Sequence, residues 1–208
     1  MLTSIESKAG SWILLVGPRS LNSTMLTAIA CLGERCSLRV LDGGNRFNAY
    51  TVARAARGRQ EAPSRDIRGI LNRITVSRAF TCYQVLSLLE STPAIQSPFV
   101  VLDLLSTFYD ESVQTGERKR LLRSCIAHLE RLVGPSAPRG AEAALKVRGQ
   151  ADGGLRPPRL VAGGVVSVHP PAVPSQAAIE LLSLLQASAA DTFFAQLPAS
   201  APEPMRLF

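Results

Sequence analysis

The chain has 208 residues, of which 46% are hydrophobic and 5% aromatic, and it carries a net charge of +7. This length and composition fit one globular domain with a core of Leu, Val, Ile and Ala, and they exclude wholesale disorder. The positive charge favours an anionic partner, such as a nucleic acid, a nucleotide or an acidic surface.

The first residues resemble neither a secretory signal nor a membrane span. The longest early apolar run, residues 12–16, is too short to cross a bilayer. The four cysteines form no CxxC pair, and His128 and His169 lie far from any metal-ligand spacing, so free thiols in a reducing compartment are expected. We therefore expect a cytoplasmic protein with no membrane partner.

Short apolar runs alternate with amphipathic stretches along the chain. Continuous apolar runs are typical of strands buried in a parallel sheet, and apolar residues three and four apart are typical of helices. Strands are predicted at 12–16, 37–41, 74–77, 99–103 and 165–168. Helices are predicted at 22–32, 47–57, 81–91, 117–133 and 175–186, with caps at Thr81 and Ser175. The alternation predicts an α/β fold whose sheet is mostly parallel, with helices on both faces.

Three segments fall outside these elements. Residues 58–69 are predicted to be a polar loop, and residues 134–160, rich in Gly, Pro, Ala and Arg, a flexible insertion in which 141–147 suits one or two helical turns. Residues 199–208 are predicted to be a frayed tail, so that 1–198 form a single domain.

The octapeptide GPRSLNST follows the first predicted strand and leads into a helix. This is the context of a phosphate-binding P-loop, G-x-x-x-x-G-K-S/T, at the carboxyl end of a parallel strand. Gly17 takes the first glycine position and Thr24 the position of the magnesium-binding hydroxyl. Asn22 replaces the second glycine, whose positive φ Asn tolerates, and Ser23 replaces the lysine. An ordinary strand-to-helix turn explains the same residues.

The fourth predicted strand, FVVLD, ends in Asp103. An apolar run ending in Asp is the Walker B pattern, in which the carboxylate orients hydrated Mg²⁺ under the phosphates. Arg19 and Arg46 lie at or next to the inferred phosphate pocket. Either arginine could replace the missing lysine charge, and both could equally be solvated loop residues.

Two further segments carry a specific resemblance: LDGGNRF at 41–47 and ITVSRAFTCYQ at 74–84. Over residues 11–133 the chain resembles the ATPase core of RecA-type recombinases, in which a D-T-E-G-T-F-like turn, a V-A-R-A-F/Y-N strand and the Walker B strand occur in this order. The resemblance implies a RecA-like P-loop core with strand order 3-2-4-5-1, and ATP and Mg²⁺ as cofactors. The residues implied at the site are Gly17, Arg19, Asn22, Ser23 and Thr24 for nucleotide, and Thr24 and Asp103 for metal.

The departures from the family concern catalysis. The family's catalytic Glu falls on Gly44, its P-loop lysine falls on Ser23, and its fifth strand ends in Asn-Gln where this chain has His169-Pro170. Losing both Lys and Glu predicts a folded core without efficient ATP hydrolysis.

The resemblance implies a degenerate paralogue in DNA repair or recombination that acts through contacts with DNA or another protein subunit. The alternatives are a structural partner subunit with no nucleotide, or an ATPase with rearranged catalytic groups. With about ten residues ahead of the first predicted strand, the chain is not expected to form long filaments.

Eight arginines lie between residues 46 and 78, opposed there by only Glu61 and Asp66. If the protein binds DNA, this stretch is expected to contact phosphates in a salt-dependent, sequence-tolerant way. No aromatic residue lies between 51 and 79, so base stacking is not expected in that range. A solvated basic face is the alternative. The expected DNA-contacting residues are Arg54, Arg57, Arg59, Arg65 and Arg68.

Overall fold

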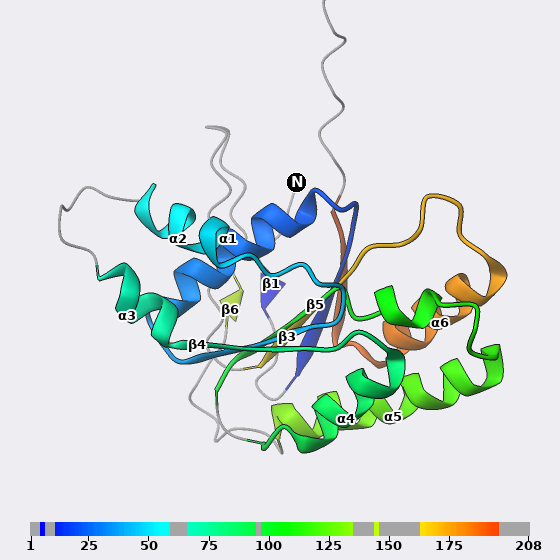
Figure 1. Cartoon of the computed structure of the whole chain (residues 1–208). Helices are drawn as coiled ribbons and strands as arrows, with labels where there is room; N and C mark the ends of the chain where they lie inside the picture. The colour runs from blue at the N-terminus through cyan, green and yellow to red at the C-terminus, as the bar shows by residue number, and fades with distance from the viewer. Residues whose placement is uncertain are drawn as a thin grey trace, which may run out of the picture.

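A parallel β-sheet lies between two layers of helices (Figure 1). The computed structural model describes residues 5–6, 11–58, 66–94, 97–134, 144–145 and 163–195. The prediction of an α/β fold with a mostly parallel sheet and helices on both faces is confirmed, because all six strands of the main sheet pair in parallel.

The main sheet has the strand order β4-β3-β5-β7-β2-β8. Its first five members in this order are the five predicted strands, and they follow the order 3-2-4-5-1 that the family resemblance implies. A separate antiparallel pair joins β1 to β6. The strands are β1 (Ile5–Glu6), β2 (Trp12–Val16), β3 (Leu38–Asp42), β4 (Ile74–Arg78), β5 (Phe99–Leu102), β6 (Ala144–Leu145), β7 (Gly164–Val168) and β8 (Asp191–Phe194).

The helices divide into two groups by the face of the sheet that they cover (Figure 1). One face carries α1 (Leu21–Gly33), α2 (Ala49–Arg57) and α3 (Ile67–Asn72). The other carries α4 (Cys82–Ser91), α5 (Thr115–Val133) and α6 (Gln176–Ser188), together with the 3₁₀ turn η1 (Ser106–Tyr109). The helix caps predicted at Thr81 and Ser175 are confirmed, since each side chain accepts a hydrogen bond from the amide three residues later.

The sheet is apolar on both faces because successive side chains of each strand enter different cores. In β2, Trp12 and Leu14 pack with α4, α5 and α6, whereas Ile13 packs with α1, α2 and α3. This arrangement explains why the strands appear in the sequence as continuous apolar runs.

Helix α3 and strand β8 are among the elements that were not predicted. The prediction of a polar loop at 58–69 is wrong at its C-terminal end, because helix α3 overlaps it. Asp66 caps this helix by accepting a hydrogen bond from the Gly69 amide at 2.8 Å, and Ile70 is buried. Strand β8 follows α6 and extends the sheet beyond β2. Its exposed or half-buried side chains give no alternating apolar signal.

Several predictions concern residues outside the described ranges: Arg59, Arg65, the tail at 199–208 and most of the insertion at 134–160. Within that insertion, residues 144–145 form β6 instead of the expected helical turn. The four cysteines are free thiols, as expected. Among the described helices, none combines the length and the apolar composition needed to cross a membrane.

Candidate functional site

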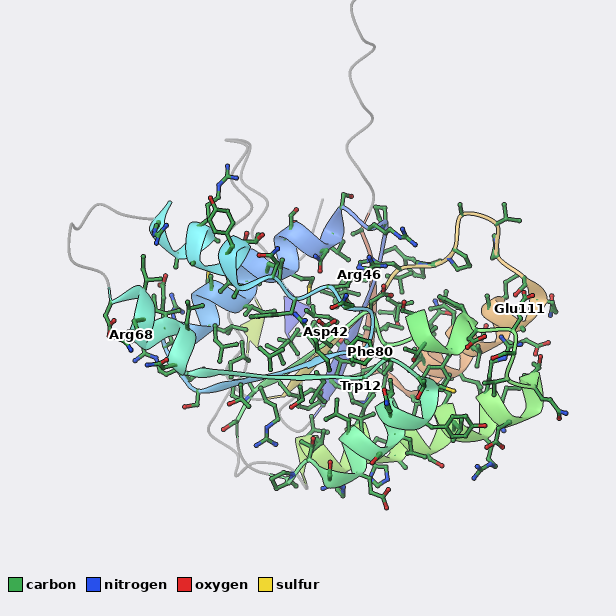
Figure 2. All side chains as sticks on the ribbon, in the orientation of Figure 1. Trp12, Asp42, Arg46, Arg68, Phe80 and Glu111 are labelled. Atoms are coloured by element: carbon green, nitrogen blue, oxygen red, sulfur yellow. The ribbon has the colours of Figure 1, made fainter. Side chains whose placement is uncertain are left out.

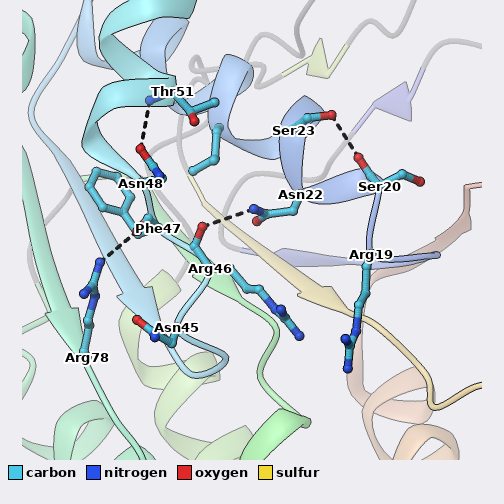
Figure 3. Close-up of a pocket in the computed structure, with 11 residues that line it drawn as sticks. Arg19, Ser20, Asn22, Ser23, Asn45, Arg46, Phe47, Asn48, Thr51 and Arg78 are labelled. Carbon is cyan, nitrogen blue, oxygen red and sulfur yellow. Dashed lines mark hydrogen bonds between the residues drawn. The ribbon is translucent and has the colours of Figure 1, made fainter.

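A pocket of about 630 Å³ opens at the carboxyl ends of the strands, between the turn that follows β2 and the turn that follows β3 (Figure 3). Ligands of parallel sheets bind at this edge. Of the predicted nucleotide-binding residues, the pocket gathers Arg19, Asn22 and Ser23. Its full lining is Arg19, Ser20, Asn22, Ser23, Leu26, Asn45, Arg46, Phe47, Asn48, Thr51 and Arg78.

The turn after β2 does not have the open backbone of a phosphate-binding loop. Helix α1 already begins at Leu21, and the amides of residues 21–23 donate to the carbonyls of residues 18–20. A phosphate loop leaves such amides free for its ligand. The expectation that Asn22 occupies a left-handed glycine position is wrong, since this residue is helical and its φ is not positive.

The side chain of Asn22 has a different role. Its Nδ2 donates to the backbone carbonyl of Arg46 at 3.1 Å, a bond that ties the two turns together across the pocket (Figure 3). Its Oδ1 is buried and has no hydrogen-bond partner among the described residues. The Asn22 side chain therefore still has an acceptor available at the pocket.

The turn after β3 is organised by the carboxylate of Asp42, which is fully buried. Its Oδ1 accepts from the Arg46 amide at 2.8 Å and its Oδ2 from the Phe47 amide at 2.9 Å. The Nε of Arg78 lies 3.2 Å from the same Oδ2. Asn45 takes the left-handed conformation, with φ 53°, that closes the turn. Charge and backbone together thus fix this side of the pocket.

Asp103 directly follows β5 beneath the pocket and is also buried, with φ 51°. Its Oδ2 accepts from Arg46 Nε at 2.9 Å, forming an ion pair, and its Oδ1 accepts from the His169 amide at 3.2 Å. The Asp103 amide donates to the Ser167 hydroxyl at 3.1 Å. Both carboxylate oxygens of this predicted metal ligand are therefore engaged by the protein itself.

Gly44 lies against Asp103. A Cβ atom built on Gly44 would fall 2.6 Å from the Cβ of Asp103, closer than two such atoms can approach. The position on which the family's catalytic Glu falls is therefore too close to Asp103 for any side chain in this arrangement. Glycine here permits the Arg46–Asp103 ion pair.

The residues present do not fit a magnesium ion. The Nε of Arg46 is paired with Asp103 Oδ2 at 2.9 Å, and Thr24, the other expected ligand, does not line the pocket. Within the described residues, no three His, Cys, Asp or Glu side chains are grouped as a metal site. Positive charge at this site comes from arginine instead.

Behind Asp103 lies a small group of buried polar side chains. The Nδ1 of His169 is 3.0 Å from the Gly17 carbonyl, and its Nε2 is buried with no partner among the described residues. Burial raises the pKa of Tyr109, and the nearby Asp103 carboxylate raises it further, so the phenol stays protonated at neutral pH. These groups connect the ends of β2, β5 and β7.

The basic residues predicted to contact DNA lie away from this pocket. Arg54 and Arg57 are exposed on α2, and Arg68 is exposed on α3, at the far left of the molecule in Figure 2. Arg46 lies near the centre in the same view. The structure thus separates the arginines into a pocket group and an outer helical group.

The chain matches no protein-family model, and no curated protein aligns with it significantly. The class of protein is therefore defined by the fold and the pocket: an α/β protein with a parallel sheet and an arginine-lined pocket at its carboxyl edge.

Proposed function

We propose that this chain is a degenerate RecA-like protein of DNA repair or recombination that binds the phosphate groups of a nucleotide and does not hydrolyse ATP efficiently. The observation that carries the proposal is the lining of the pocket, which contains three arginines and no acidic residue. Arginine is permanently charged and offers paired N–H donors that match a phosphate. The strand order supports the resemblance on which the biological role rests.

The three arginines have different freedom. Arg46 and Arg78 are held from below by Asp103 and Asp42, respectively, whereas Arg19 is exposed and has no ion-pair partner among the described residues. In Figure 3 the side chains of Arg19 and Arg46 extend in the same direction. A guanidinium has five N–H donors, and Arg46 uses its Nε for Asp103, so its terminal nitrogens would serve the ligand. A bound phosphate would be the third anion beside these arginines, after the carboxylates of Asp42 and Asp103.

Nucleotide binding is tested with a fluorescent ATP analogue and the full chain. Arg19→Ala should weaken binding about tenfold, because it removes a charge-assisted hydrogen bond without disturbing an internal contact. Arg123→Ala is the matched control, since Arg123 is an exposed arginine of α5 that does not line the pocket. Equal loss in both variants, or no binding by the parent, would refute phosphate binding in this pocket.

Hydrolysis is expected to be negligible. The chain has Ser23 in place of the P-loop lysine and no side chain at Gly44, and Asp103 is neutralised by an arginine. Turnover of ATP should therefore stay below about 1 s⁻¹ with or without Mg²⁺. Faster magnesium-dependent turnover that disappears in Asp103→Asn would favour the alternative of an ATPase with rearranged catalytic groups.

A second candidate function, a partner subunit without a nucleotide, is favoured by two exposed aromatic side chains. Phe80 is 68% exposed and Tyr83 is 51% exposed, at the end of β4 and the start of α4. Exposed aromatics of this kind are enriched at protein interfaces. A photo-crosslinking residue at position 80, compared with one at position 123, tests this in cells. Crosslinks at position 80 alone support a partner subunit.

A further inference from the structure

Helix α2 presents an aromatic side chain and two arginines on one exposed face. Tyr50, Arg54 and Arg57 are spaced by four and three residues, which places them along the same side of a helix. Tyr50 is 71% exposed, and both arginines are exposed. The opposite side of the helix, with Val52 and Ala56, is fully buried in the core. The face is therefore fixed in its orientation towards solvent.

The surroundings of this face are basic. Within the described residues, Arg54, Arg57 and Arg68 have no ion-pair partner. The described acidic residue of this region, Asp66, accepts a hydrogen bond from the Gly69 amide at the start of α3. Unpaired arginines on two packed helices attract a polyanion.

Tyr50 changes what this basic region can bind. Base stacking was not expected from the sequence, because the range 51–79 contains no aromatic residue and Tyr50 precedes it by one position. The helix brings Tyr50 onto the same face as Arg54 and Arg57. An exposed ring next to arginines is an arrangement with which proteins hold single strands, by stacking on a base and pairing with phosphates.

Helix α2 also borders the arginine pocket by another side. Asn48, which caps α2, and Thr51, in its first turn, both line that pocket. On the exposed side, Arg54 lies one helical turn beyond Tyr50, and Arg57 follows it. A strand that runs along this side of α2 would meet the ring first and then the two arginines.

We infer that the exposed face of α2 binds single-stranded nucleic acid, with a base stacked on Tyr50 and phosphates paired with Arg54 and Arg57. A duplex would meet the same charges, but its paired bases would not reach the ring. The inference deepens the proposed role in DNA repair, on which it rests. It does not require a nucleotide in the pocket, so the two proposals can fail separately.

The experiment is a fluorescence-anisotropy titration of the full chain with oligothymidine of about 20 nucleotides at low salt. Tyr50→Ala should weaken binding about tenfold, Tyr50→Phe should bind like the parent, and an abasic oligomer should bind the parent as weakly as oligothymidine binds Tyr50→Ala. Tyr83→Ala is the matched control, since Tyr83 is another exposed tyrosine that begins α4.

The charged part of the face is tested by salt dependence. The double variant Arg54→Glu with Arg57→Glu should abolish binding at moderate salt, and each lost phosphate contact should reduce the slope of log affinity against log salt by about 0.7. Arg123→Glu on α5 is the control. Unchanged binding by Tyr50→Ala, equal loss with Tyr83→Ala, or no binding by the parent would overturn the inference. Binding of the fluorescent ATP analogue by Tyr50→Ala, measured in parallel, tests nucleotide binding in the pocket independently of the α2 face.

Discussion

The two turns that form the pocket are built differently, although each joins a parallel strand to a helix on the same face of the sheet. The turn after β2 is held by its own backbone, and Ser20 makes no side-chain cap for α1. The turn after β3 is held by the buried Asp42 carboxylate, which binds the amides of Arg46 and Phe47, and Asn48 caps α2.

This difference shows which turn carries the fixed charges of the pocket. A RecA-type P-loop would place its phosphate contacts on the first turn, whereas here the fixed charges belong to the second turn and to Asp103. A backbone turn whose amides are internally bonded has few donors left for a ligand. An arginine held by a carboxylate keeps other donors facing outwards. Substitutions in the two turns should therefore differ in their effect on stability.

The largest effect is expected for Asp42→Ala. The variant leaves the amides of Arg46 and Phe47 without their acceptor, and each hydrogen bond to a charged group contributes about 1.5–3 kcal/mol. Because the Arg78 side chain is 42% exposed, its ion pair adds little. We expect the free energy of unfolding in urea to fall by about 3 kcal/mol.

The control for that change is Glu111→Ala, an exposed acid at the far right of the molecule in Figure 2. Its effect on stability should stay within about 0.5 kcal/mol. If Asp42→Ala costs no more than this control, the second turn is not organised by the carboxylate.

An intermediate effect is expected for Gly44→Ala. The added Cβ would meet the Cβ of Asp103 at 2.6 Å, and such overpacking costs about 1–3 kcal/mol. Gly116→Ala in α5 is the opposite case, because nothing lies within 4 Å of its added Cβ and alanine favours the helix. Thermal unfolding of both variants distinguishes steric conflict from a general effect of alanine. Equal melting temperatures would show that Gly44 does not constrain Asp103.

The smallest effect concerns the two helix caps. Asn48 accepts from the Thr51 amide at 3.0 Å, so Asn48→Ala should cost about 1 kcal/mol. Ser20 makes no such bond, so Ser20→Ala should be nearly neutral. Urea titrations of the pair measure the difference directly. Equal losses would mean that the two turns are stabilised in the same way.

Much of the sheet could be predicted from the sequence because its signals are local. Each buried strand is a short apolar run, and the segments around Asp42 and Arg78 supported the family resemblance that implied the strand order. Strand β8 was missed because it is short and its side chains are partly exposed. Helix α3 was missed because six residues give too little periodicity.

The candidate site was predictable only in part. Of the residues predicted to bind nucleotide or metal, Arg19, Asn22 and Ser23 line the pocket, whereas Gly17, Thr24 and Asp103 do not. The Arg46–Asp103 ion pair joins residues 57 positions apart, and no local pattern reports such a pair. The signal that could have helped is Asp42 followed by Gly43 and Gly44, a sequence typical of a carboxylate that binds its own turn.

The most direct test of the account is calorimetric titration of the full chain with ATP, once with Mg²⁺ and once with a chelator. If Arg46 supplies the positive charge at Asp103 that a metal would otherwise supply, ATP should bind equally well in both, within about twofold, which is about 0.4 kcal/mol. Binding that requires Mg²⁺, or no binding in either buffer, would contradict the central claim that arginines form this phosphate site.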